Sequence, residues 1–147
     1  MAKAFEGIKV VDFSQVLAGP FATQQLALQG AGVIKIEQRG TGDQARAMMA
    51  PEGPIRDHGM GAIFLCVNAG KRSITLDLTK ENGRAVAHRL MTGADVIVES
   101  YRTGVARKLD VHYERARTLN PAIVYCAITA YGQARTMATV PARTRVA

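Results

Sequence analysis

Short apolar runs rich in β-branched residues alternate along this chain with longer stretches of helical periodicity, and this alternation most constrains the fold. We expect strands at residues 8–13, 32–37, 73–78, 95–99 and 123–128. Near-continuous apolar strands are typical of a parallel sheet that is buried on both faces. The sequence therefore predicts an α/β fold, a Rossmann-like wound and mostly parallel sheet with helices on both sides.

The expected helices have recognisable ends. One opens at Gly19-Pro20 and stops at Gly30, because Pro suits a first helical turn and Gly a C-terminal stop. A second is expected at residues 79–92, with Thr79 as its cap, and short ones at 105–109 and 113–119. Residues 38–61 read as an irregular loop, and residues 62–67 are compatible with helix or strand.

Ligands of wound sheets bind at the carboxyl ends of the strands. In this chain those ends are the turns at residues 14–18, 38–42, 78–80, 100–104 and 129–133, which hold most of the polar residues between the expected strands and helices. A ligand site is therefore expected along this edge.

Composition narrows the class of protein. The formal net charge of the 147 residues is +7, and residues 101–147 carry 8 basic and 2 acidic groups, which favours an anionic partner there. No aromatic and basic residues interleave as in nucleic-acid-binding proteins, so a phosphorylated small molecule is the better candidate and nucleic acid is not expected. No apolar run approaches the ~20 residues of a membrane span, and no signal peptide is evident. We expect a cytoplasmic protein with no membrane partner.

Tests for catalytic and cofactor motifs are mostly negative. The first expected strand leads into a turn with a single glycine, which disfavours a dinucleotide site; GKRS at residues 70–73 lacks the earlier glycine of a P-loop. His58, His88 and His112 lie far apart, and Cys66 and Cys126 read as buried apolar residues, so no metal site is expected. Buried Asp12 and Glu99 are either catalytic or cap loop amides.

A series of short phrases runs along the chain in a distinctive order and spacing. They are EGIKVVDFS at 6–14, AGP at 18–20, GVIKIE at 32–37, GTGD at 40–43, NAGKRSITLDL at 68–78, ADVIVE at 94–99, LNP at 119–121 and YGQ at 131–133. Together they resemble the N-terminal signature of the class III CoA-transferases, the family of formyl-CoA transferase, carnitine CoA-transferase and alpha-methylacyl-CoA racemase. The resemblance covers residues 5–133.

This resemblance implies that residues 5–133 form an incomplete N-terminal CoA-binding domain, normally completed by a later segment, in an interlocked homodimer. Residues 134–147 depart from the family pattern as a basic tail, which suggests a truncated or frame-shifted chain. Coenzyme A would lie across the carboxyl ends of the strands.

The family's CoA-binding positions carry over residue by residue. Gln38 stands where a basic residue is common, with Arg39 next to it; Thr79 stands where a lysine is usual, followed by Lys80; and Ser100-Tyr101 replaces an Asn-aromatic turn. The resemblance implies cofactor contacts at Leu17, Ala18, Arg39, Leu76, Asp77, Leu78, Thr79, Lys80, Ser100, Tyr101, Arg102 and Lys108.

The resemblance also implies a reaction in which CoA moves from an acyl-CoA thioester to a carboxylic acid through an aspartyl-CoA intermediate. The family's reacting aspartate lies beyond the residues matched here, so no catalytic residue is assigned and this chain alone is expected to be inactive. A non-catalytic CoA-binding fragment and a racemase-like protein are the alternatives.

Overall fold

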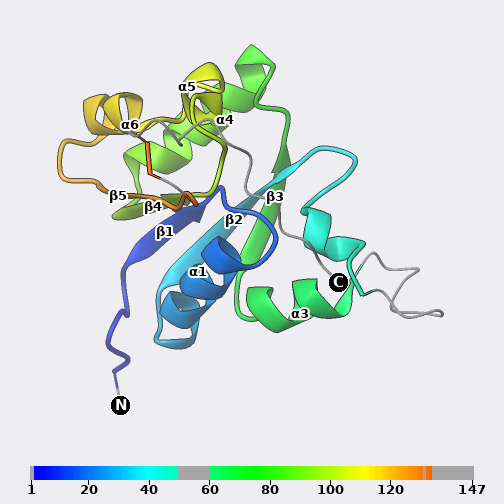
Figure 1. Cartoon of the computed structure of the whole chain (residues 1–147). Helices are drawn as coiled ribbons and strands as arrows, with labels where there is room; N and C mark the ends of the chain where they lie inside the picture. The colour runs from blue at the N-terminus through cyan, green and yellow to red at the C-terminus, as the bar shows by residue number, and fades with distance from the viewer. Residues whose placement is uncertain (1, 50–59, 131, 134–147) are drawn as a thin grey trace.

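The computed structural model describes residues 2–49, 60–130 and 132–133 (Figure 1). Within them, five strands form one sheet: β1 (Lys9–Asp12), β2 (Gly32–Gln38), β3 (Arg72–Leu76), β4 (Val96–Glu99) and β5 (Val124–Ala127). The helices are α1 (Ala18–Leu28), α3 (Ala62–Asn68), α4 (Glu81–Thr92), α5 (Val105–Lys108) and α6 (Tyr113–Leu119), with a 3-10 turn, η1 (Gln44–Arg46).

The strand order is β3-β2-β1-β4-β5, and all four pairings are parallel. The chain builds outward from β1 to β3 and then returns to β1's other side for β4 and β5. The predicted wound α/β sheet is confirmed. The order reverses between β1 and β4, and in such sheets that reversal opens a crevice at the carboxyl ends of the strands.

Alternate strand residues face opposite sides of the sheet, and each side has its own core. Val10, Val33 and Val98 form one core with side chains of α1. On the other side, Val11 and Ile97 pack with buried residues of α4 and α6. Figure 1 accordingly shows α1 on one face and α4, α5 and α6 on the other.

Strand β5 ends the sheet and is poorly covered. Val124 is 61% exposed, and Cys126 and Ala127 of the same strand are exposed as well. Cys66, on α3, is also exposed. The prediction that both cysteines are buried was wrong. An apolar run does not by itself distinguish a core element from an exposed one, and Cys126 lies on an edge strand while Cys66 lies on the exposed side of a short helix.

Several element boundaries differ from expectation. Residues 62–68 are helical, which settles the open choice between helix and strand. Helix α4 begins at Glu81 with Lys80 as its N-cap, so Thr79 does not cap it. Strand β3 correspondingly ends at Leu76 because Asp77 turns the chain. The expected loop at residues 38–61 contains the η1 turn, whose cap is the Asp43 carboxylate accepting from Ala45 N.

Two predictions concern residues outside the described part of the chain: His58, and the basic tail at 134–147. Among the helices that are described, none is long and apolar enough to cross a membrane.

Candidate functional site

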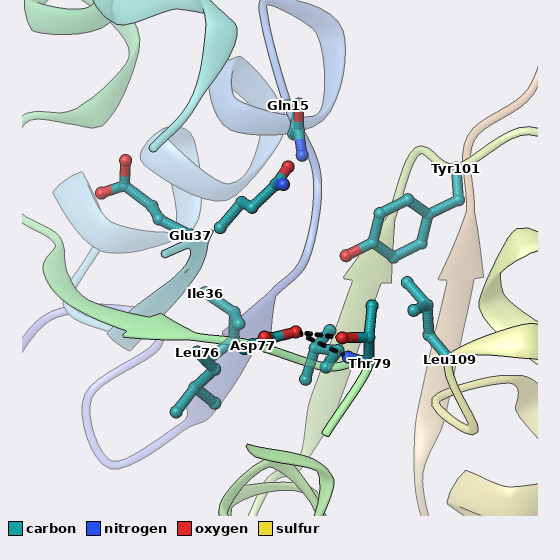
Figure 2. A pocket seen from close by; sticks show the side chains of 10 residues that line it. Gln15, Ile36, Glu37, Leu76, Asp77, Thr79, Tyr101 and Leu109 are labelled. Atoms are coloured by element: carbon teal, nitrogen blue, oxygen red, sulfur yellow. Dashed lines mark hydrogen bonds between the residues drawn. The ribbon is translucent and has the colours of Figure 1, made fainter. Parts of the chain in front are cut away.

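A pocket opens at the carboxyl ends of β1, β2, β3 and β4, where the sheet reverses its order (Figure 2). Its volume is about 160 Å³. Drug-sized ligands occupy roughly 300–1,000 Å³, so this pocket accommodates one flat group of a larger ligand. It is lined by Gln15, Ile36, Glu37, Gln38, Leu76, Asp77, Leu78, Thr79, Tyr101 and Leu109.

The pocket walls combine apolar surface with a few polar groups. Figure 2 shows Tyr101 and Leu109 on one side, facing Ile36 and Leu76 across the opening. The Glu37 carboxylate points away from them in the same view. Apolar walls with few polar groups suit a planar ring that needs orientation as well as burial.

The turn after β3 supplies the polar groups nearest these walls. The Asp77 carboxylate accepts hydrogen bonds from the Thr79 hydroxyl, at 2.5 Å, and from Thr79 N, at 3.0 Å. The Thr79 bonds, and then the charges of Lys80 and Arg39, hold the pKa of Asp77 below its usual value. A carboxylate therefore stands at this rim, with two cations near enough to act on it.

Tyr101 follows β4 directly and closes the pocket from the opposite side. Burial raises the pKa of its phenol, and the charges of Glu99 and Asp12 raise it further. The phenol is therefore neutral at pH 7, and its ring is largely buried.

The turn between β1 and α1 brings Gln15 to the pocket. Gln15 N donates to the Ser100 hydroxyl at 3.0 Å, so the ends of β1 and β4 are tied together. Figure 2 shows the Gln15 side chain reaching toward the opening from this turn.

The structure brings five of the twelve predicted site residues into the pocket lining: Leu76, Asp77, Leu78, Thr79 and Tyr101. Five others are exposed or half-buried around the same edge of the sheet. These are Leu17, which caps α1, Ala18, its first residue, Arg39, next to Gln38, Lys80, the α4 cap, and Lys108, next to Leu109.

The remaining two predicted residues lie elsewhere on this edge. The Ser100 hydroxyl accepts the hydrogen bond from Gln15 N, and Ser100 itself does not line the pocket. Arg102 lines a second hollow of about 410 Å³ at the ends of β4 and β5. That hollow also contains Glu99, Arg107, His112, Glu114 and Gln133.

Sequence reasoning did not assign Gln15, Ile36, Glu37, Gln38 or Leu109 to the site. Gln15 and Gln38 stand in turns that were expected at the ligand edge, so position alone was a usable signal for them. Leu109 reaches the pocket only through the fold of the α5 segment, which no local pattern reveals.

The two buried carboxylates cap loop amides. Asp12 accepts from Ser14 N at 2.9 Å, from the Thr23 hydroxyl at 2.6 Å and from Lys71 Nζ at 3.0 Å. Glu99 accepts from Tyr101 N at 2.7 Å, and burial raises its pKa. The capping interpretation is confirmed for both, since each binds the amide two residues after it.

Within the described ranges, no three His, Cys, Asp or Glu side chains cluster in a way that could hold a metal ion.

Known proteins resemble this chain in sequence and in fold. The curated relatives include an acyl-CoA transferase of Fusarium pseudograminearum, 42% identical over 97% of this chain and 31% of its own length. A succinate–glutarate CoA-transferase of Agrobacterium fabrum is 42% identical over 86% of this chain and 32% of its own length. The chain thus spans about a third of the length of these relatives.

A solved CAIB/BAIF family protein from Brucella suis superposes with a TM-score of 0.84 at 36% identity. That likeness covers 95% of this chain and 37% of the Brucella protein. The family model described as CoA-transferase family III matches residues 5–146. On these grounds, the chain belongs to CoA-transferase family III.

Proposed function

We propose that this chain provides the coenzyme A-binding part of a CoA-transferase. The observation that carries the proposal is the pocket at the sheet's reversal point, where Leu76, Thr79 and Tyr101 come together from two separate strand ends. The family membership supports transfer of CoA in general, and the pocket supplies a location for it.

The chemistry of the pocket fits one end of coenzyme A. The adenine ring is flat and largely apolar on its faces, which matches walls built from Ile36, Leu76 and Tyr101. The amides and carboxylate at its rim suit the ring's polar edge. A volume of about 160 Å³ leaves the phosphates and the pantetheine arm outside, along the carboxyl ends of the strands.

Cations on the rim suit the phosphates. Coenzyme A carries a 3′-phosphate and a diphosphate, and charge-assisted hydrogen bonds from Arg and Lys are the strong way to bind them. Arg39 and Lys80 act electrostatically on Asp77 at the pocket, and Lys108 adjoins Leu109 of its lining. We assign phosphate contacts to Arg39, Lys80 and Lys108 at this rim; a contact at Arg102, which lines the second hollow, rests on the family resemblance alone.

In the reaction that we propose for the whole protein, an aspartate attacks the thioester carbonyl and releases the CoA thiolate, giving a mixed anhydride. The thiolate attacks the aspartyl carbonyl, forming aspartyl-CoA and freeing the donor acid. The acceptor carboxylate then displaces the thiolate, and the thiolate finally attacks the acceptor's acyl group, which regenerates the aspartate. We place this aspartate in the part of the family that the chain does not span, and no described residue is assigned to it.

A second candidate is that these 147 residues, taken alone, bind CoA without transferring it. They span 29% to 32% of the length of the first curated relatives, so most of such a relative has no counterpart among them. A racemase-like reaction, the interlocked homodimer, the domain division at residue 133 and a cytoplasmic location also stay proposals drawn from the family resemblance.

Calorimetric titration of the 147-residue chain with coenzyme A tests the proposal. We expect Arg39→Ala and Lys108→Ala each to weaken binding by roughly 1–3 kcal/mol, which is about 5- to 150-fold. Arg117→Ala is the matched control, because Arg117 is an exposed cation on α6 that lines neither hollow.

Incubation of the same chain with labelled acyl-CoA thioesters and carboxylic acids separates the two candidate functions. Binding without thioester exchange supports the non-transferring polypeptide, whereas turnover contradicts it. Unchanged affinity for coenzyme A in both Arg39→Ala and Lys108→Ala would contradict the placement of the phosphates at this rim.

A further inference from the structure

The turn between β1 and α1 contains a backbone conformation that its sequence does not favour. Val16 has a φ of 69°, in the left-handed region, although it is neither glycine nor asparagine. A β-branched residue there is a genuine outlier, and such conformations persist only where the surrounding structure imposes them. The surroundings of Val16 therefore need to supply the stabilisation.

A buried ion pair supplies it. Lys35 Nζ lies 2.7 Å from Asp43 Oδ2, and the two side chains are 1% and 0% exposed. Each partner also binds the turn, because Asp43 Oδ1 accepts from Val16 N at 3.0 Å and Lys35 Nζ donates to Ser14 O at 2.8 Å. The pair thus binds the backbone on both sides of Gln15.

Two further backbone amides of the same turn are also hydrogen-bonded to side chains. Ser14 N donates to Asp12, and Gln15 N donates to the Ser100 hydroxyl. Gly19 packs so closely on Ser14 that a Cβ there would overlap the serine side chain. The backbone N–H groups of Ser14, Gln15 and Val16 therefore each donate to a side chain outside the turn, and the exposed Leu17 and Ala18 follow directly.

We propose that Lys35 and Asp43 are positioning residues for the ligand: they hold Val16 left-handed so that Gln15 faces the pocket and Leu17–Ala18 stand at its rim. This inference rests on the proposed function, since the ligand is coenzyme A. Neither residue lines the pocket, so neither touches the ligand there. A rigid, preorganised turn lowers the ordering cost of binding.

The test replaces the whole pair by apolar residues, because breaking a buried pair on one side leaves an unpaired charge whereas an apolar replacement is often neutral. In Lys35→Met with Asp43→Leu, we expect a folded chain with a lowered melting temperature, because the bonds of Asp43 to Val16 N and Ala45 N are lost together with the pair. We also expect about tenfold faster hydrogen exchange at the Val16 amide and about tenfold weaker binding of coenzyme A.

Adding Val16→Asn to that double variant gives the rescue, because asparagine tolerates the left-handed region. We expect it to recover several-fold in affinity. Val33→Ala is the matched control: it opens a small cavity two residues from Lys35 in β2 and leaves the turn's hydrogen bonds in place. We expect it to lower the melting temperature without changing affinity.

Parent-like affinity in the folded double variant, or no recovery with Val16→Asn, would overturn the proposal. If the double variant does not fold, Val16→Asn in the parent chain decides: a raised melting temperature supports a conformation held under strain, and a lowered one contradicts it. Failure of the parent chain to bind coenzyme A refutes the proposed function instead, and the exchange rate of the Val16 amide still reports whether the pair holds the turn.

Discussion

Glu37 shows how a buried carboxylate is kept charged beside the pocket. Its side chain is 1% exposed, and Arg46 Nε donates to it at 2.6 Å while the Ser73 hydroxyl and Asp43 N donate as well. Burial raises the pKa of Glu37, but the hydrogen bonds from Arg46, Ser73 and Asp43 outweigh it and lower the pKa to about 2. The guanidinium of Arg46 also stacks over Phe64 of α3, which joins the helix to this network.

This lowered pKa predicts a loss of stability in acid. Glu37 contributes its full stabilisation above its ordinary pKa of 4.5, and loses it as pH falls from there toward about 2. The contribution is roughly 3–4 kcal/mol, from about 1.4 kcal/mol for each pH unit between 4.5 and about 2. Urea unfolding between pH 2 and pH 6 measures it, with Glu37→Gln as the variant.

We expect Glu37→Gln to be less stable than the parent chain at pH 6 and to approach it near pH 2. A matched control is Glu81→Gln, which changes an exposed carboxylate at the start of α4. A constant stability difference between Glu37→Gln and the parent chain over this range would contradict the assignment.

Individual site residues were predictable from the sequence to different degrees. Leu76 lies in the family phrase at 68–78, Tyr101 is the aromatic residue of the turn after β4, and Thr79 stands where the family usually has a lysine; the structure brings all three together. The left-handed φ of Val16 and the place of Leu109 in the pocket were not predictable, because both depend on groups far away in the chain.

At the scale of elements, the close approach of α4 to the end of β3 shapes the pocket. A Cβ at Gly83 would overlap the backbone carbonyl of Asp77, so only glycine lets the first turn of α4 lie against this segment. Asp77 and Thr79 then form their turn at the pocket rim.

Gly83→Ala is therefore expected to destabilise the protein by about 1–3 kcal/mol, the usual range for overpacking, and to weaken coenzyme A binding by moving the turn. Thermal unfolding and calorimetry measure the two effects. Gly93→Ala is the control, since the nearest atom to a Cβ there is 3.9 Å away. Equal melting temperatures for the two variants would contradict the close packing at Gly83.

Element types were more predictable than element ends. Glycine and the Asn-Pro pair ended α1, α4 and α6 where expected, because these residues act locally. Thr79 was expected to cap α4 but bonds to Asp77 instead, and that choice depends on how α4 packs against β3.

At the scale of the whole molecule, one side of the sheet is thinly covered. Among the described helices, α1 alone contributes side chains to the core that carries Val10 and Val98, and Val124 of β5 is 61% exposed. Leu17 and Phe21 of α1 are 55% and 52% exposed. The wound, parallel sheet followed from sequence pattern, but the strand order and the place of this open face did not, because apolar runs show neither which strands pair nor what covers them.

We expect the purified 147-residue chain to bind a hydrophobic dye at native pH, because Leu17, Phe21 and Leu28 of α1 and Val124 of β5 are exposed. Fluorescence with 1-anilinonaphthalene-8-sulfonate measures this binding. Leu17→Ser with Phe21→Ser is expected to reduce the fluorescence. A clean two-state unfolding transition without dye binding would contradict the open face.

The central claim is that coenzyme A binds where the wound sheet reverses its strand order. Titration of the isotopically labelled chain with coenzyme A, followed by amide chemical shifts, tests it most directly. We predict saturable shifts at Gln15, at Leu76 to Thr79 and at Tyr101, with little change in α6. Shifts that are absent from these residues, or that cluster on α6 and β5, would contradict the claim.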